Sequence, residues 1–415
     1  MRGHIGAWVA AVLLAAPAAV FAQGERIAEI RVHGNYTTPD ADVLALCGLK
    51  AGDPATDERI AAAQKALEDS DRFDDVEVRK RFRSIDDPTD ILVMIVVREH
   101  PGVTEDDLTP GAFKRFRALQ QWIPILNYAD GYGLTYGART SFSGLAGRDT
   151  RLSIPLSWGG ERRAAAELAR TFESGPLSVA RGSLFVNRRV NPHYELSDVR
   201  LGVRLGAEKS VTPWLRAGAD GRLERVDFGG TGSVRHSAAG AHVTLDTRLD
   251  PSFPRNAVFT QLAWERVAFP SGHAGRALLD ARGFVGLLGS PVLALRAQVA
   301  RADAPLPSAE QPLLGGGSTV RGYRAGNRAG DSLAAVSAEL RVPLTSPLNF
   351  GRFGVKGFVD AGTVWSAGQR LSDQPWDRGI GGGVFFGASV LTLDVDVAWP
   401  EHGNPRAHFS LGVTF

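Results

Sequence analysis

The sequence predicts a mainly β protein in which a transmembrane antiparallel β-barrel of about 16 strands follows one small α+β domain. Three observations predict this fold: a short apolar segment at the N-terminus, a charge-rich region of mixed period up to residue 100, and two-residue alternation that recurs over residues 131–415. A barrel region of about 285 residues, at roughly 18 residues for each strand and its connection, gives about 16 strands, with 14 and 18 as the neighbouring even counts.

The first 22 residues have the pattern of a secretory signal peptide. Arg2 supplies a positive charge, an apolar run extends from Ile5 to Val20, and small residues end at Ala22 before a cleavage site at Gln23. The alternative is a membrane anchor, but the run is short for a span of about 20 residues. We therefore expect residues 1–22 to be a signal peptide.

Composition limits the partners that we expect. A formal net charge of +2 gives no reason to expect nucleic acid. Cys47 is the only cysteine, so no intrachain disulfide is expected, and its apolar helical surroundings predict a small core residue rather than a reactive thiol. The mean hydropathy of −0.09 fits a soluble exported protein as well as a barrel.

Residues 24–100 form the predicted small domain, and residues 101–130 a linker. The linker is expected to contain a short amphipathic helix, because Phe113, Phe116, Leu119 and Trp122 recur at helical spacing. The elements expected in the small domain are a strand over 27–32, a helix from Asp40 to before Gly48, a helix from about Asp57, a strand from Val76 and a strand over 91–97.

The region from residue 131 to residue 415 is the predicted barrel. A sheet packed on a soluble core gives strict alternation once or twice, whereas here it recurs with Trp and Phe at strand ends, which favours a lipid-facing exterior and a polar lumen. By this alternation Glu339 and Asp360 face the lumen. Asp394 and Asp396, two residues apart on one strand, are interpreted as hydrated lumen carboxylates.

The sequence gives no sign of an enzyme, a cofactor or a metal site. The chain has no His-x-x-x-His pair and no Gly-x-Ser-x-Gly elbow. The glycine-rich run at 379–383 begins an alternating strand with no helix after it, so it is interpreted as a barrel feature rather than a phosphate-binding loop.

Several segments resemble the BamA/TamA-type outer-membrane protein assembly superfamily (the bacterial surface antigen family). Residues 24–100 are similar to a single POTRA domain, and the other segments follow in the order that the superfamily has. These are the signature Val320-Arg321-Gly322-Tyr323, the strands at 337–340 (SAEL) and 358–365 (FVDAGTVW), and the segment 246–251 (DTRLDP).

The resemblance implies that the signature loop folds back into the barrel and places Arg321 in the lumen. Glu339 and Asp360 already face the lumen by alternation, and a guanidinium can bind two carboxylates with its fixed fork of N–H donors. We therefore expect Val320, Arg321, Gly322 and Tyr323 to be held by Glu339 and Asp360. The alternative is that these are unrelated, solvated lumen charges.

The function that the resemblance implies is assembly or insertion of outer-membrane proteins, in an accessory or specialised role because only one POTRA domain is present. The POTRA-like domain would receive clients along 76–82. A weak seam between a first strand at 131–143 and a last strand at 407–415 would template an incoming strand. The residues expected to form that last strand and its terminal signal are Phe409, Leu411, Val413 and Phe415.

Two other functions stay open: a secretion pore for a partner protein and a passive porin. In each case we expect the barrel in a Gram-negative outer membrane with the N-terminal domain in the periplasm. The expected partners are the lipid bilayer, unfolded outer-membrane or secreted client proteins, and accessory periplasmic proteins or lipoproteins.

Overall fold

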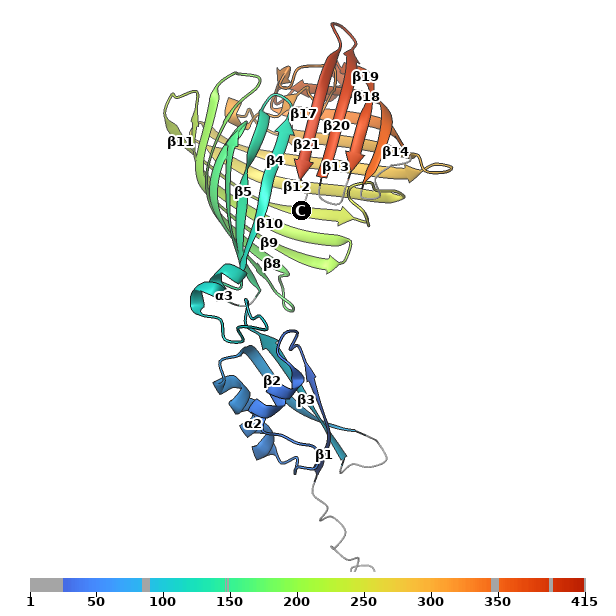
Figure 1. Cartoon of the computed structure of the whole chain (residues 1–415). Coiled ribbons are helices and arrows are strands. Elements are labelled where there is room, and N and C mark those ends of the chain that lie inside the picture. The colour runs from blue at the N-terminus through green and yellow to red at the C-terminus, as the bar shows by residue number, and fades with distance from the viewer. Residues whose placement is uncertain are drawn as a thin grey trace, which may run out of the picture. The chain divides into compact units, whose positions relative to one another are not determined.

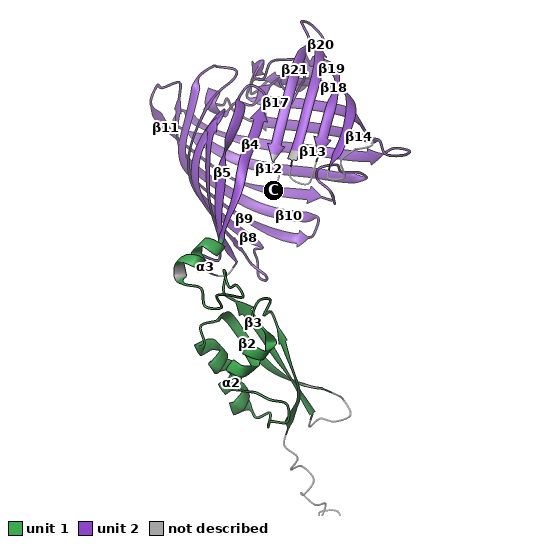
Figure 2. Cartoon of the chain, in the orientation of Figure 1, with its two compact units in different colours: residues 1–119 green, residues 120–415 purple. Residues whose placement is uncertain are grey.

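The computed structural model describes residues 25–83, 90–145, 147, 149–344, 351–387 and 391–413. The predicted signal peptide and Phe415 lie outside these residues. The chain forms two compact units, residues 1–119 and residues 120–415, which Figure 2 distinguishes by colour.

The first unit contains the small α+β domain in the predicted order of elements. Its sheet has the order β1-β3-β2, in which β3 pairs in parallel with β1 and antiparallel with β2. The elements are β1 (Arg26–His33), α1 (Asp40–Cys47), α2 (Asp57–Asp69), β2 (Phe73–Phe82), β3 (Asp90–Glu99) and, after the sheet, α3 (Ala112–Ala118).

Apolar side chains from the sheet and from both helices form one core in this domain. Val43 of α1, Leu67 of α2 and Val93 of β3 are fully buried. Cys47 is buried in the same cluster, as the sequence predicts. The core therefore depends on apolar burial, at roughly 25 cal/mol for each Å² removed from water.

The turn between β1 and α1 is fixed by two residues. Gly34 has a positive φ of 89°, and a Cβ there would lie 1.9 Å from the carbonyl oxygen of Val97. Glu99 accepts hydrogen bonds from the backbone N–H groups of Thr37 and Thr38, at 3.1 and 2.5 Å. Burial raises the pKa of Glu99, but the hydrogen bonds from Thr38 and Thr37 outweigh it and leave this pKa below its usual value.

The second unit is a closed antiparallel barrel of 16 strands, which confirms the predicted fold and strand number (Figure 1). Consecutive strands are neighbours throughout, and the long segment between β14 and β17 carries two short strands that form their own sheet, β15 (Leu313–Leu314) and β16 (Arg328–Ala329). The barrel strands are β4 (Gln120–Ala129), β5 (Gly133–Ser143), β6 (Thr150–Gly159), β7 (Glu161–Thr171), β8 (Val179–Val190), β9 (Ser197–Thr212), β10 (Leu215–Phe228), β11 (Ser233–Asp246), β12 (Ala257–Phe269), β13 (Gly272–Gly286), β14 (Val292–Ala302), β17 (Ser332–Pro343), β18 (Arg352–Trp365), β19 (Asp377–Gly387), β20 (Leu391–Pro400) and β21 (Arg406–Val413).

Outward and inward positions alternate along these strands as predicted. Val336, Val359 and Trp399 point out of the barrel and are exposed, whereas Glu339 and Asp360 point into it and are buried. The outer surface is therefore apolar and the lumen carries the charges, which is the pattern of a barrel in lipid.

The structure corrects the predicted start of the barrel. The first strand is β4, at Gln120–Ala129, so the barrel begins before residue 131 and the segment 133–143 is the second strand. The predicted linker helix ends at Ala118, and Trp122 lies on β4 with 67% of its surface exposed. The stretch 122–126 is apolar at every position, Pro124 included, so it lacks the two-residue alternation that identifies a strand. The helical spacing of the apolar residues before it therefore led to the wrong prediction that the helix includes Trp122.

In the described part of the chain, no helix is both long enough and apolar enough to cross a bilayer.

Candidate functional site: the signature loop and the barrel seam

Residues 303–331, between β14 and β17, form the segment that we call the signature loop. Val320 is fully buried and packs in one cluster with Leu314, Val364 and other apolar side chains, with Tyr323 against its edge. This cluster fixes the backbone on both sides of Arg321. The loop is therefore held by apolar packing as well as by charge.

Two glycines allow the loop to approach the barrel wall. Gly322 has a positive φ of 98°, and a Cβ there would lie 2.8 Å from the backbone nitrogen of Pro400. Gly379 of β19 lies opposite, where a Cβ would come within 2.0 Å of the carbonyl oxygen of Arg321. Any side chain at either position would displace the loop from the wall.

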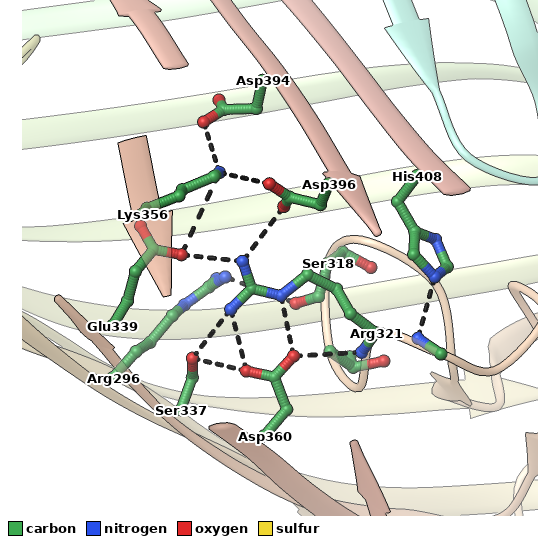
Figure 3. Close-up of polar contacts among 12 residues, drawn as sticks. Arg296, Ser318, Arg321, Ser337, Glu339, Lys356, Asp360, Asp394, Asp396 and His408 are labelled. Carbon is green, nitrogen blue, oxygen red and sulfur yellow. Dashed lines mark hydrogen bonds and ion pairs between the residues drawn. The ribbon is translucent and has the colours of Figure 1, made fainter. Parts of the chain in front are cut away.

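Arg321 contacts three lumen carboxylates (Figure 3). Asp360 of β18 is the principal partner: its oxygens accept from the guanidinium Nε and Nη2 at 2.7 and 2.9 Å and from the Arg321 backbone N–H at 3.1 Å. Nη1 donates to Glu339 at 2.7 Å and to Asp396 at 3.1 Å. The fork geometry thus joins β17, β18 and β20 through one side chain.

An aromatic ring and a hydroxyl complete the surroundings of the guanidinium. The carbon at the centre of the guanidinium of Arg321 lies 3.3 Å from the ring centroid of Phe358, which is a cation–π contact. Ser337 donates to Asp360 at 2.6 Å and accepts from Arg321 at 3.3 Å. The five donors of Arg321 are therefore held by four side chains, and Ser337 orients the main carboxylate.

Asp396 belongs to this cluster, so its interpretation as a hydrated lumen carboxylate is wrong. It is buried between Arg321 and Lys356, whose Nζ lies 3.0 Å from Asp396 and 2.5 Å from Asp394. The sequence did place Asp396 on the lumen side of its strand, and Lys356 has the same direction as Asp360 because the two residues are four positions apart on one strand. The sequence could not show that these two strands meet beside the loop, which depends on the three-dimensional arrangement.

Pairing between opposite charges explains how the ionisable side chains of Arg321, Glu339, Lys356, Asp360 and Asp396 can be buried together. Burying a charge without a partner costs several kcal/mol, and removing one member of a buried pair costs roughly 3–5 kcal/mol. Here three cations, Arg321, Arg341 and Lys356, lie against the carboxylates of Glu339, Asp360, Asp394 and Asp396. Glu339 accepts a hydrogen bond from each of the two arginines at 2.7 Å. Loss of Arg321 would therefore leave Asp360 and Asp396 close together without their common cation.

A second cluster, which sequence reasoning missed, fixes the other part of the signature loop. Glu310 is buried and pairs with Arg200 of β9 at 3.1 Å and with Arg222 of β10 at 2.8 Å. His236 of β11 lies 3.2 Å from the same carboxylate, and Arg276 of β13 donates to the Glu310 carbonyl oxygen at 3.1 Å. No motif marks Glu310; the signal available was the set of inward-facing arginines on neighbouring strands.

The seam between the last strand and the first is the second candidate site. Among the described residues, β21 and β4 share one ladder pair, Leu411 with Tyr128, whereas every other neighbouring pair of barrel strands has at least six. The ring of Phe409 meets the ring of Tyr128 edge-on, with centroids 5.0 Å apart. Val413 ends β21, and of the four residues predicted for this strand only Phe415 lies outside the described residues.

Comparisons with known proteins agree with this geometry. Residues 25–100 match the POTRA family described as surface antigen variable number repeat, and residues 145–415 match the Omp85 superfamily domain. No curated protein matches the sequence.

Two solved structures share the fold. The first is BamA from Haemophilus ducreyi lacking POTRA domains 1–3, with 14% identity over 94% of this chain and 84% of that chain, and a TM-score of 0.63. The second is CdiB from Escherichia coli, with 13% identity over 94% of this chain and 76% of that chain, and a TM-score of 0.54. Because the Omp85 domain covers more than half of the sequence, and one POTRA domain precedes it, the chain belongs to the Omp85 superfamily of outer-membrane β-barrels.

Proposed function

We propose that this protein assembles other β-barrel proteins into the outer membrane, in an accessory or specialised role. The observation that carries the proposal is the seam, where one residue pair joins β21 to β4 among the described residues. Strands whose backbone groups are unpaired bind other extended chains readily, because each free N–H and C=O gains a partner.

The first strand offers such an edge over most of its length. Residues 120–127 pair with β5 on one side and have no ladder partner in β21 among the described residues. Pro124 lies in the middle of this strand and has no N–H to donate, which is tolerated at an edge and rare inside a sheet. An incoming strand of a client could therefore extend the barrel sheet at this edge.

The POTRA domain supports the same proposal with a second edge strand. In the order β1-β3-β2, strand β2 pairs with β3 alone among the described residues. A strand added along residues 76–82 would replace the hydrogen bond that the Val78 N–H donates to Gln64. We propose that this domain lies in the periplasm and receives extended clients there. Its partners would be unfolded outer-membrane proteins, with accessory periplasmic proteins or lipoproteins as further candidates.

The signature loop supports an active role over passive diffusion. Its two charged clusters fix it to two separate parts of the barrel wall, at β9–β13 through Glu310 and at β17–β20 through Arg321. A diffusion pore does not need a loop fixed in this way. Secretion of a partner protein remains the competing function within the superfamily, and it is an outcome of the following test.

Deletion of the gene, followed by quantification of outer-membrane proteins, secreted proteins and small-solute uptake, tests the proposal. We expect a subset of barrel proteins to fall in abundance, and expect wild type but not Arg321→Ala to restore them. Arg324→Ala is the matched control, because Arg324 is in the same loop but forms an exposed pair with Glu195. Unchanged barrel proteins would refute assembly: loss of a secreted protein would then support secretion, and loss of solute uptake would support a porin.

A further inference from the structure

One imidazole joins three segments of the barrel at the seam. His408 of β21 is buried, with 4% of its side chain exposed, and its Nδ1 atom lies 2.6 Å from the Asp130 carboxylate, directly after β4. Its Nε2 atom lies 2.8 Å from the backbone nitrogen of Gly322 in the signature loop. The last strand, the end of the first strand and the loop thus meet at His408.

The chemistry of the partners fixes the protonation of the ring. The Gly322 N–H can only donate, so Nε2 must accept, and the proton of the neutral ring is on Nδ1. That Nδ1–H then donates to Asp130, whose carboxylate can accept. Both hydrogen bonds form together only with this tautomer, so the loop and the turn after β4 select one state of His408.

Close packing joins the same two segments independently of the ring. Gly131 has a positive φ of 82°, and a Cβ there would lie 2.5 Å from the Cβ of Ala325 in the signature loop. A Cβ at Gly316 would lie 3.0 Å from the Asp130 carboxylate. The loop therefore lies directly against the turn that begins at Asp130.

We infer that His408 is a positioning residue that couples the signature loop to closure of the seam. While the loop occupies its observed position, the Gly322 N–H holds the imidazole against Asp130, and this pair holds β21 against the Ala129 end of β4. Displacement of the loop removes the bond to Gly322 and loosens the seam. The inference rests on the proposed function only in treating the seam as the site where clients enter.

Hydrogen exchange of the purified full chain in lipid nanodiscs, without any client, tests the coupling. Exchange in the peptide covering β21 (Arg406–Val413) reports opening of the seam, and exchange in β10 reports the continuous wall. We expect His408→Phe to accelerate exchange in β21 by about tenfold or more, because a buried hydrogen bond to a carboxylate is lost, and to leave β10 unchanged.

Two further variants separate hydrogen bonding from packing. His408→Gln keeps a donor and an acceptor at the end of the side chain, so we expect it to restore much of the protection that His408→Phe removes. Asp130→Ala changes a residue outside the strands and removes the same bond from the other side, so it covers the case in which His408→Phe fails to fold. Wild-type exchange in β21 of folded Asp130→Ala would overturn the inference.

The link to the loop has its own test. Arg321→Ala should accelerate exchange in β21, and adding His408→Phe should add little, because both changes break one connected path. If the double variant accelerates exchange by the product of the two single-variant factors, the two changes act independently, and this result would also overturn the inference. If the seam loosens as expected while the abundance of client barrels is unchanged, the proposed function fails and the coupling stands.

Discussion

The wall of the barrel and its seam are built from the same antiparallel strands but are closed by different interactions. β10 pairs with β9 over a ladder from Leu215 to Phe228, whereas β21, as far as the structure describes it, pairs with β4 at one position. Side chains replace the ladder at the seam: the Tyr128–Phe409 ring contact and the His408–Asp130 hydrogen bond. The wall can open only by breaking many backbone hydrogen bonds, whereas a few side-chain contacts hold the seam.

The largest expected effect comes from removing the cation that organises the seam side of the barrel. Arg321→Ala should destabilise the loop by roughly 3–5 kcal/mol, because it leaves the buried carboxylate of Asp360 without its cation. Asp360→Ala should come next and Glu339→Ala last, since Asp360 accepts three of the hydrogen bonds from Arg321. Limited proteolysis of the loop and heat-modified gel mobility measure the order, with Arg324→Ala as the control. Equal effects of Glu339→Ala and Asp360→Ala would contradict the assignment of Asp360 as the principal partner of Arg321.

A smaller effect is expected at the wall. Glu310→Ala removes the carboxylate that faces Arg200 and Arg222, but Asp198 and Glu224 remain as partners of Arg200. We expect the loop to become sensitive to protease near Glu310, because its local stability falls by about 1–3 kcal/mol. Hydrogen exchange in β21 should stay near that of the wild type. Accelerated exchange in β21 equal to that of Arg321→Ala would show that the wall and the seam are not separate.

The aromatic contact at the seam should have a still smaller effect. Phe409→Ala removes an edge-on ring pair worth about 0.5–1.5 kcal/mol, so exchange in β21 should rise by roughly two- to tenfold. Val397→Ala is the matched control, because Val397 is an exposed outward residue of β20 within a continuous ladder. Similar exchange in both variants would mean that the rings do not hold the seam.

The smallest effect lies in the POTRA domain, which belongs to neither the wall nor the seam. The pKa of Glu99 is below its usual value, so its contribution to stability is present above about pH 4.5 and is lost as pH falls through the lowered value. Amide exchange of Thr37 and Thr38 should therefore accelerate in acid, after correction for intrinsic rates, and Glu99→Gln should remove most of this dependence. An unchanged acid response in Glu99→Gln would exclude Glu99 as its cause.

Alternation and length were sufficient to predict the barrel, its strand number and the inward direction of Glu339 and Asp360. They failed at β4, where apolar residues occur at successive positions and the two-residue period disappears. Asp396, Lys356, Glu310 and His408 could not be assigned because their roles depend on which strands the loop reaches. Whether a side chain points inward or outward can be predicted from the neighbouring residues on its strand. These contacts instead join residues that are up to 278 positions apart, as for His408 and Asp130.

The most direct test of the account fastens the seam covalently and measures assembly. In a Cys47→Ser background, Tyr128→Cys with Leu411→Cys places thiols at the seam pair, and Val203→Cys with Leu223→Cys places them at a matched wall pair. The assay measures insertion of the barrel protein that falls most in the deletion strain, with each pair oxidised and then reduced. We expect oxidation to stop insertion at the seam pair and not at the wall pair, and reduction to restore insertion. Equal insertion by the oxidised and the reduced seam pair would show that the seam does not open for assembly.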